Sequence, residues 1–355
     1  MPAGGGPAPV QTRSRKIDTH PNTVGGRDDQ ARARARIALT LGDVRGIGPE
    51  VARKALEKLS PPAESVTVVA PEGEDTFGFP TVRLAVDASE PGRAAGQAIE
   101  KAVQMALLGE VDAIVTGPIH KPSLTKAGFS FPGHTEMLQA LTGAVDVGML
   151  MCHETGTAPG RTAGRSPLRI LLATTHVALR DVPHLLTAET LVRQTRLLWN
   201  ALGGDWGIET PRIALCAFNP HASDEGLFGD EESRIYEPAL ETLSAQYGMD
   251  VTGPVPADSV FRRALQGEFD AVVAPYHDVG MAAFKTVSFG SGVNVTLGLP
   301  FVRTSPDHGT AFGIAGKDAA DPTSMGRALE LALRLAGNRR RTQGAGEGRT
   351  ARETA

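Results

Sequence analysis

The chain has 355 residues, of which 41% are hydrophobic, 21% charged and 5% aromatic, and its formal net charge is −4. This length supplies apolar material for one large or two medium domains, and it excludes a mini-protein, a coiled coil and a collagen-like fibre. No window approaches about 18 consecutive apolar residues, so we expect no membrane span. The two cysteines, Cys152 and Cys216, form no CxxC pair, so neither a disulfide framework nor a thiolate zinc site is indicated. We therefore expect a cytoplasmic protein.

The charge is unevenly distributed along the chain. Residues 1–36 carry a net charge of +4 and residues 338–355 a net charge of +3, which leaves −11 between them. Both ends are rich in glycine, arginine and polar residues and have almost no large apolar side chains, so we predict two disordered basic tails. The basic runs are short and lack aromatic residues for base stacking, so no nucleic-acid partner is expected.

Between the tails, strand-like and helix-like segments alternate, which predicts an α/β fold. Residues 155–168 have the composition of a flexible hairpin tip between two strands. We expect strands over residues 37–41, 66–70, 112–116, 148–152, 169–174, 212–218 and 270–274, and helices over 49–59, 93–108, 188–202, 231–247 and 322–336.

A glycine-rich loop, GDVRGIGPE, follows the first predicted strand at residues 42–50. It matches neither GxGxxG nor GxxxxGK[ST], so neither the dinucleotide fingerprint nor a P-loop is indicated. A strand–glycine loop–helix junction can bind an anion or simply turn the chain, and the spacing leaves both interpretations open.

Histidines follow several of the predicted strands. In open α/β sheets, ligands bind beyond the carboxyl ends of the strands, so we expect these side chains to meet in one cleft. Three imidazoles that leave coordination positions open suit a catalytic divalent metal, although each alone could be a capping or core histidine. The three candidates are His176, His221 and His277, and the neighbouring Asp258 and Asp278 would orient an imidazole or cap a helix.

A second group of residues is suited to anion binding. His134 and Thr135 open a predicted helix, where backbone N–H groups and a hydroxyl converge; the alternative is an ordinary threonine cap. Lys285, Asn294 and Arg303 lie in a glycine-rich apolar segment with few charges, where cations usually face a ligand or a carboxylate. This pattern predicts a phosphate or carboxylate ligand.

Several segments, taken together, resemble the 4-hydroxythreonine-4-phosphate dehydrogenase family of pyridoxal phosphate biosynthesis. The resemblance runs from about residue 37 to residue 336. Its most specific pieces are GPIHKPSLTKAGFSFPGHTE (117–136), ATTHVALRDV (173–182), NPHASDEGLFGDEE (219–232), PADS (256–259), PYHDVGMAAFK (275–285) and GVNVTLGLPFVRTSPDHGTAFGIAGK (292–317).

The resemblance implies a two-domain α/β fold like that of the isocitrate and isopropylmalate dehydrogenases, with the active-site cleft between the domains. Residues 37–127 and 317–337 would form one domain. Residues 128–316 would form the other and carry the metal, substrate and dimer elements. The family pattern also implies a homodimer whose subunits share the site.

The resemblance further assigns roles to individual residues. It implies a divalent metal (zinc, magnesium or cobalt) on the three histidines and NAD on a cofactor loop. In that loop Gly313 stands where the decarboxylating dehydrogenases have an acidic residue, so NADP is possible as well. Arg45 stands where the family commonly has a Pro-Ala pair. The implied substrate-binding residues are His134, Thr135, Lys285, Asn294 and Arg303, the catalytic candidates are Lys285, Asp278 and Asp258, and the cofactor residues are His308, Gly309, Thr310 and Ala311.

The implied reaction is the metal-dependent, NAD(P)-linked oxidation of 4-phosphooxy-L-threonine, a small phosphorylated hydroxy-amino acid. The product, 2-amino-3-oxo-4-phosphooxybutanoate, would lose carbon dioxide to give 3-amino-2-oxopropyl phosphate. One alternative is a related dehydrogenase of 4-phosphoerythronate, 4-phosphothreonate or a ring dihydrodiol. Another is a metal-dependent hydrolase or lyase, which is disfavoured because no general-base glutamate adjoins the histidines as in HExxH.

Overall fold

The computed structural model of the chain describes residues 35–154 and 166–353. Ala35 is fully buried, and the backbone N–H of Arg36 donates to the Asp112 carboxylate at 2.7 Å, so the described chain begins inside the predicted basic tail. The rest of that tail, and residues 155–165 of the predicted hairpin tip, lie outside the described residues. No described helix is long and apolar enough to cross a membrane.

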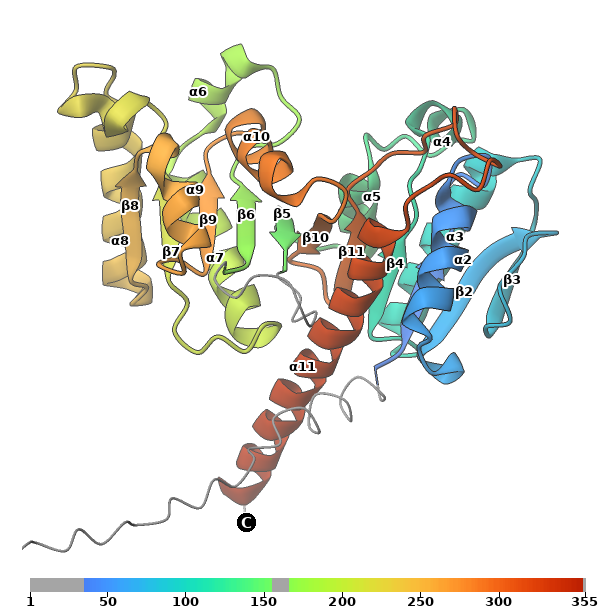
Figure 1. Cartoon of the computed structure of the whole chain (residues 1–355). Helices are drawn as coiled ribbons and strands as arrows, with labels where there is room; N and C mark the ends of the chain where they lie inside the picture. The colour runs from blue at the N-terminus through green and yellow to red at the C-terminus, as the bar shows by residue number, and fades with distance from the viewer. Residues whose placement is uncertain (1–34, 155–165, 354–355) are drawn as a thin grey trace, which may run out of the picture.

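An 11-stranded mixed sheet forms the centre of the molecule (Figure 1). Seven of its strands lie where apolar runs predict them, and β1, β4, β7 and β9 are buried at every position, as expected for parallel strands covered on both faces. The strand order is β3-β2-β1-β4-β11-β10-β5-β6-β9-β7-β8. The bounds are β1 (Ile37–Thr40), β2 (Val66–Glu72), β3 (Thr81–Asp87), β4 (Ala113–Thr116), β5 (Gly148–His153), β6 (Leu168–Leu172), β7 (Ile213–Cys216), β8 (Val251–Val255), β9 (Ala271–Ala274), β10 (Val293–Leu297) and β11 (Val302–Pro306).

Four strands are missed by the apolar-run criterion: β3, β8, β10 and β11. The last two form an antiparallel hairpin inside the glycine-rich segment that was expected to bind the ligand. The turn between them needs Gly298, whose φ is +89° and whose added Cβ would lie 2.0 Å from the carbonyl oxygen of Asp146. Polar residues interrupt the apolar pattern of this hairpin, so the sequence pattern did not predict β10 and β11 as strands.

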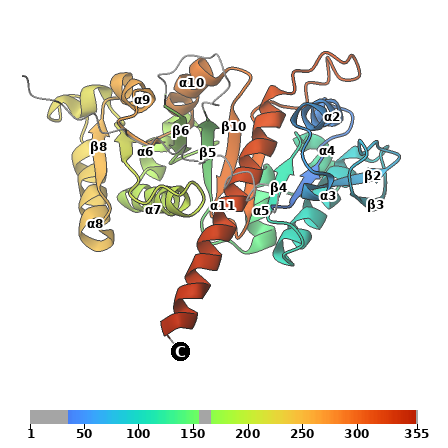
Figure 2. The ribbon, with the colours of Figure 1, turned by 60° about the horizontal axis from the view of Figure 1, so that its bottom comes forward.

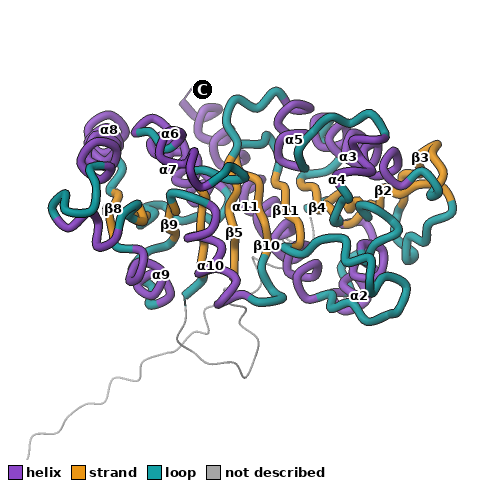
Figure 3. Tube along the Cα trace, turned by 90° about the horizontal axis from the view of Figure 1, so that it is seen from above, coloured by secondary structure: helices purple, strands orange, loops and turns teal. Residues whose placement is uncertain are grey.

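Helices cover both faces of the sheet (Figure 3). Near β8, α7 and α8 lie on one face and α9 and α10 on the other, and near β3, α3 lies opposite α2. All five predicted helices are present. The bounds are α2 (Gly48–Leu59), α3 (Pro91–Leu107), α4 (Lys121–Lys126), α5 (His134–Thr142), α6 (Val182–Leu185), α7 (Ala188–Gly204), α8 (Glu237–Tyr247), α9 (Ala257–Leu265), α10 (His277–Ser288) and α11 (Thr323–Glu353), with short turns η1 (Ala63–Ser65), η2 (Leu179–Asp181), η3 (Pro220–Asp224) and η4 (Glu232–Tyr236).

Three clusters of buried apolar side chains join these helices to the sheet. The largest contains residues of α2, α7, α8 and α11, the second residues of α3 and α5, and the third residues of α9 and α10. Both cysteines are buried free thiols within these clusters. Burial raises the pKa of Cys216 to about 12, so this residue is a protonated core thiol at neutral pH.

Helix α11 crosses the middle of the sheet and continues beyond it (Figures 1 and 2). The prediction of a disordered tail from residue 338 is therefore wrong for the start of that tail. Asn338 donates to the carbonyl oxygen of Asp205, and Arg339 forms two 2.7 Å bonds with the Asp205 carboxylate. Arg339 belongs to a run of arginines that the sequence pattern predicted to be solvated. It is held instead by Asp205, 134 positions away, and the helix continues through the run.

The direction of the strands changes at the centre of the sheet. The pairs β11–β10, β10–β5 and β5–β6 are antiparallel, whereas the pairs on both sides of them are parallel. Ligands of α/β sheets bind beyond the carboxyl ends of the strands, so the ends of β4 and β11, which pair in parallel next to this central region, mark the expected location of a site. One continuous sheet runs through both predicted domains, and their boundaries stay a prediction.

Candidate active site

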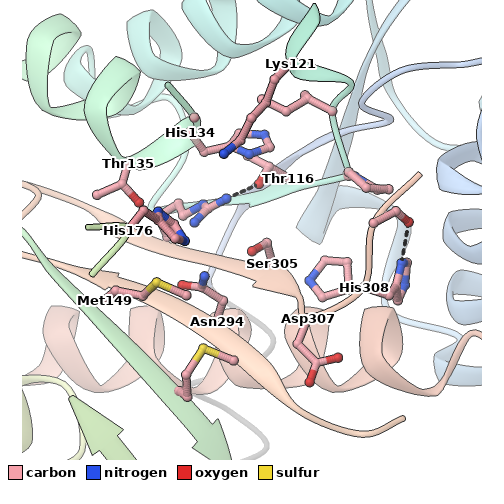
Figure 4. A pocket seen from close by; sticks show the side chains of 18 of the residues that line it. Thr116, Lys121, His134, Thr135, Met149, His176, Asn294, Ser305, Asp307 and His308 are labelled. Atoms are coloured by element: carbon pink, nitrogen blue, oxygen red, sulfur yellow. Dashed lines mark hydrogen bonds between the residues drawn. The ribbon is translucent and has the colours of Figure 1, made fainter. Parts of the chain in front are cut away.

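A cavity of about 280 Å³ lies beyond the carboxyl ends of β4 and β11 (Figure 4). Its walls are the segment after β4, the start of α5, the central strands β5, β10 and β11, and the segment after β11. The structure thus brings together residues that are almost 200 positions apart in the chain. The predicted site residues that line it are His134, Thr135, His176, Asn294, Arg303, His308 and Gly309.

Strand register explains how polar side chains reach the cavity from buried strands. Asn294 of β10 is paired with Ser305 of β11 on one side and with Met151 of β5 on the other. Arg303 lies two residues before Ser305 and therefore points to the same face of the sheet. Alternate residues of the central strands thus form the floor of the cavity, while the residues between them pack in the core.

Arg303 is a buried cation whose described contacts include no carboxylate. Its side chain is only 2% exposed, and its guanidinium donates to Thr296 Oγ1 at 3.0 Å and Thr116 Oγ1 at 2.6 Å. Burial lowers the pKa of Arg303 to about 9. A charged group held in such surroundings calls for a compensating anion, so Arg303 is suited to a phosphate or carboxylate ligand.

Four buried side-chain atoms around the cavity have no hydrogen-bond partner among the residues the structure describes. Buried polar atoms without partners are rare in folded proteins, and each calls for a ligand, an ion or a water. Because all four side chains line the same cavity, a single polar ligand can satisfy them together. The atoms are His134 Nε2, Asn294 Oδ1, Arg303 Nε and His308 Nε2.

His134 begins helix α5, with Thr135 beside it in the first turn (Figure 4). Burial, together with the positive charges of Arg303 and Lys121, holds the pKa of His134 well below its usual range. His134 is therefore a neutral imidazole that recognises its ligand by hydrogen bonding and not by charge.

Lys285 projects from α10 to the rim of the cavity, where its ammonium donates to Asp307 Oδ2 at 2.9 Å and to the Asp307 carbonyl oxygen at 3.0 Å. Asp307 lines the cavity, and its side chain is 4% exposed. The sequence predicted Lys285 but not its partner. No local pattern marks Asp307, because the two residues meet only when α10 packs on β5, β6 and β9 and its Lys285 reaches the segment that follows β11.

The three predicted metal-binding histidines follow three adjacent parallel strands: β6, β9 and β7. The rings of His176 and His277 lie 5.5 Å apart. Asp278 Oδ1 accepts a hydrogen bond from Nδ1 of His277 at 2.7 Å, which leaves Nε2 of that ring available. Partial burial, Lys121 and His277 lower the pKa of His176, which favours the neutral form that binds metals.

His221 occupies the next strand exit, on the exposed turn η3. Within residues 35–154 and 166–353, no three His, Cys, Asp or Glu side chains are close enough to hold a metal ion. The single chain therefore gathers two of the three predicted imidazoles, and the complete set is not assembled in it. Asp258 is exposed in the first turn of α9, away from the cavity lining.

The glycine-rich loop after β1 supports the predicted cofactor loop. The N–H of Ile47 donates to the carbonyl oxygen of Thr310 at 2.9 Å, and the Arg45 guanidinium lies 5.5 Å from the centre of the Phe312 ring. Ala311 follows with a positive φ of 45°. Thr310 and Ala311 lie outside the cavity lining, next to Gly309 at its rim.

Sequence reasoning missed several polar residues of the lining. Lys121 directly follows His120, a histidine close behind a predicted strand. Its charge lowers the pKa of both His134 and His176. Its position after the strand could therefore have identified it as a site residue. Thr116 and Ser305 lie inside strands and carried no such signal. The additional polar residues of the lining are Thr116, Lys121, Glu136, Ser305 and Asp307.

The architecture is shared with the isocitrate dehydrogenases. The crystal structure of isocitrate dehydrogenase from Methylococcus capsulatus matches with a TM-score of 0.51, covering 86% of each chain at 17% identity. At this identity the likeness concerns the fold alone, and it confirms the predicted α/β fold class.

Other relatives are more similar in sequence. A 4-hydroxythreonine-4-phosphate dehydrogenase from Klebsiella pneumoniae, solved at 1.25 Å, matches with a TM-score of 0.72 and 36% identity over 85% of this chain and 99% of that one. A curated 4-hydroxythreonine-4-phosphate dehydrogenase from Paracoccus denitrificans (strain Pd 1222) is 39% identical over 325 residues, which cover 85% of this chain and 98% of the relative. A terephthalate 1,2-cis-dihydrodiol dehydrogenase from Burkholderia xenovorans LB400 matches at 27% identity with a TM-score of 0.60, over 84% of this chain and 97% of that one.

These three relatives are named as dehydrogenases, a class of oxidoreductase. The family model described as pyridoxal phosphate biosynthetic protein PdxA matches residues 21–332, and the chain belongs to this family. The resemblance drawn from the sequence motifs is thereby confirmed.

Proposed function

We propose that this chain is a dehydrogenase that oxidises the secondary alcohol of 4-phosphooxy-L-threonine with NAD or NADP. The product, 2-amino-3-oxo-4-phosphooxybutanoate, then loses carbon dioxide to give 3-amino-2-oxopropyl phosphate for pyridoxal phosphate biosynthesis. The observation that carries this proposal is the buried Arg303 guanidinium, whose described contacts are hydroxyls and not carboxylates. It is supported by the unpartnered atoms of His134 and Asn294 in the same cavity.

The residues of the cavity would hold the anionic substrate in one orientation. Arg303 supplies positive charge from the floor, while His134 and Thr135 supply hydrogen bonds at the start of α5. Lys121 adds a second cation at the rim. Holding the substrate at several points fixes the position of the reacting alcohol, which is a large part of the rate gain in such reactions.

Lys285 would act next to the reacting carbons. Its ammonium, which donates to the Asp307 carboxylate at 2.9 Å, would stabilise the negative charge that develops as carbon dioxide leaves the ketone intermediate. The same ammonium can donate a proton to the resulting enolate. Asp307 holds the Lys285 side chain in place through both its carboxylate and its carbonyl oxygen.

We also propose a divalent metal at His176, His221 and His277. The donor chemistry fits, because the three imidazoles follow adjacent parallel strands and two of their rings lie 5.5 Å apart. Imidazole ligands suit zinc or cobalt better than magnesium, which prefers oxygen. When bound, the metal would act as a Lewis acid on the substrate alcohol. We further propose a cytoplasmic homodimer whose subunits share the site.

The second candidate is a related dehydrogenase acting on 4-phosphoerythronate or 4-phosphothreonate. These substrates present the same phosphate and secondary alcohol to Arg303 and His134, so the cavity supports them as well. A ring dihydrodiol is less well supported, because its hydroxyls offer no charge to Arg303 and only a ring carboxylate, as in terephthalate, would supply one.

An absorbance assay tests the proposal. Purified protein with zinc or cobalt, 4-phosphooxy-L-threonine and NAD or NADP should produce reduced nicotinamide at 340 nm. 4-Phosphoerythronate and 4-phosphothreonate serve as competing substrates, and phosphate release reports a hydrolase. No reduced nicotinamide with any of the phosphorylated acids would refute a dehydrogenase. The variant His221→Ala should lose both metal binding and turnover, and retained turnover would refute the metal assignment.

A further inference from the structure

The turn that carries His221 has an unusual backbone. Five consecutive residues after β7 have positive φ angles: His221 (53°), Ala222 (57°), Ser223 (70°), Asp224 (48°) and Glu225 (59°). None of them is glycine. In this left-handed region the Cβ crowds the backbone, and non-glycine residues visit it singly and not in runs. Such a turn persists only where the surrounding structure holds it.

One buried carboxylate provides most of that support. Glu232, at the start of η4, is only 5% exposed. Its Oε1 accepts the backbone N–H groups of Phe218 at 2.9 Å and Asn219 at 2.7 Å. Its Oε2 accepts Asn219 Nδ2 at 2.8 Å and also the Ser223 hydroxyl. The carboxylate thus binds the chain on both sides of His221.

The carboxylate is chemically specific for this role. Four donors surround it, and no ion pair of Glu232 occurs among the described residues. An ionised carboxylate only accepts hydrogen bonds. A glutamine would direct an NH₂ group at Asn219 Nδ2 or at a backbone N–H, so at least one donor would lose its partner.

The segment bearing Glu232 is itself anchored to the sheet. The Tyr236 hydroxyl donates to the carbonyl oxygen of Cys216, the last residue of β7, at 2.8 Å, and Tyr236 is fully buried. Asn219 is also held from this segment by Glu231, whose Oε2 accepts Nδ2 at 2.7 Å. Strand β7 and the η4 segment therefore form a fixed frame across which Glu232 holds the turn.

We propose that Glu232 is the positioning residue that sets the His221 imidazole at the strand-exit edge for metal binding. The inference rests on the proposed metal role of His221. Glu232 holds the left-handed turn through Ser223 and Asn219 and does not itself contact the metal. Groups that orient metal ligands typically change metal affinity by about 10–100-fold when they are removed.

The test compares Glu232→Gln with Glu237→Gln, a matched change at an exposed glutamate five residues later. Isothermal titration with Co²⁺ or Zn²⁺ should give a dissociation constant raised at least about 10-fold for E232Q and unchanged for E237Q. Hydrogen exchange followed by mass spectrometry should show faster exchange at residues 218–223 in E232Q alone. Ser223→Ala, which removes one of the four donors, should shift both readouts in the same direction by a smaller amount, and it serves as the test if E232Q does not fold.

The outcomes separate this inference from the proposed function. If His221→Ala binds metal as tightly as the wild-type protein, the proposed metal role of His221 fails, and the positioning role fails with it. If His221→Ala loses metal while E232Q and S223A keep wild-type affinity and exchange, the metal role stands and Glu232 is not the positioning residue. A loss of affinity in E232Q that is matched in E237Q would overturn the inference as well.

Discussion

The Lys285 ammonium lies 2.9 Å from the Asp307 carboxylate, and the same residue's carbonyl oxygen accepts a second bond from it at 3.0 Å. Asp307 is held in turn by Ser324, whose hydroxyl accepts the Asp307 N–H at 3.0 Å. Lys285 is 41% exposed and Asp307 only 4%. Ion pairs with one solvated partner contribute about 1 kcal/mol or less to stability, so orientation of the ammonium is the main effect of this pair.

Replacing Asp307 by asparagine should therefore reduce activity far more than stability. We expect Asp307→Asn to lower kcat by about 10–100-fold, less than the roughly 10²–10⁴-fold contribution of a positioned proton donor or acceptor because Lys285 itself remains, with a change in Tm of only a few degrees. The control is Asp318→Asn, which alters an exposed carboxylate. A kcat that stays at the wild-type value, or falls only in proportion to the folded fraction, would contradict the positioning role.

Arg303 should determine recognition of the substrate's anionic group. We expect Arg303→Gln to raise KM for the phosphorylated substrate by about 10–100-fold, because hydrogen bonds to charged groups contribute about 1.5–3 kcal/mol. Unphosphorylated 4-hydroxythreonine provides the comparison, since the variant should discriminate poorly between the two. Arg327→Gln, on the solvent side of α11, is the matched control. An equal rise in KM for both substrates would show that Arg303 supports the fold and does not bind the phosphate.

The buried neutral His134 should make stability depend on pH. Its pKa lies well below 6.5 in the folded chain because of burial, Arg303 and Lys121, so the unfolded chain binds one more proton below about pH 6.5. Stability is therefore lost as pH falls below that value, by up to about 1.4 kcal/mol per pH unit.

Urea unfolding between pH 5 and 7.5 measures this effect. His134→Gln should have a shallower slope of stability against pH than the wild-type protein. The exposed His184 offers the control, since His184→Gln should leave the slope unchanged. Identical slopes in the wild-type protein and H134Q would exclude a strongly perturbed His134.

The Glu154 carboxylate should raise the free energy of unfolding at neutral pH and lose this effect in acid. Although burial acts to raise its pKa, Arg169 and Arg334 outweigh that effect and hold the pKa at about 2, with bonds of 2.7 Å from each arginine. A carboxylate with a depressed pKa stabilises the fold above its unfolded value near 4.5, and this contribution disappears as pH falls towards 2.

Glu154→Gln should cost about 3 kcal/mol in unfolding free energy at pH 7. The difference from the wild-type protein should shrink progressively between pH 4.5 and 3, as measured by denaturant titration. Glu57→Gln, at an exposed ion pair, should change stability by less than about 0.5 kcal/mol. A constant difference over this pH range would show that the carboxylate charge is not the source of the effect.

Discrimination between NAD and NADP should be weak. Gly313 provides no carboxylate to reject a 2′-phosphate, and the half-exposed Arg45 lies against Phe312 of the same loop. We expect the kcat/KM values for the two cofactors to differ by less than about a thousandfold, roughly 4 kcal/mol. Arg45→Ala should reduce kcat/KM for NADP more than for NAD. A larger difference in the wild-type protein, or an equal effect of R45A on both cofactors, would contradict this role.

The sequence alone was sufficient for the fold class and for much of the site. Short apolar runs that end in polar residues mark strand exits, because a buried strand leaves the core where its side chains become polar. His176 was predicted in this way, whereas His134 was predicted from its place at the start of a helix and Arg303 as a cation in an apolar segment. All three line one cavity. Family membership was also determined by local motifs, since it depends on the identity and order of residues and not on their contacts.

The tertiary structure alone decided which side chains meet. Thr116 and Ser305 enter the cavity lining because strands distant in the chain pair with one another. Asp307 becomes the partner of Lys285 because helix α10 packs against the sheet. Glu232 supports the His221 turn through contacts with residues 9 to 14 positions away, which no sequence periodicity predicts. Local patterns encode which face of an element is apolar, whereas strand order and register follow from packing the whole sheet at once, and it is this packing that converts scattered polar residues into a site.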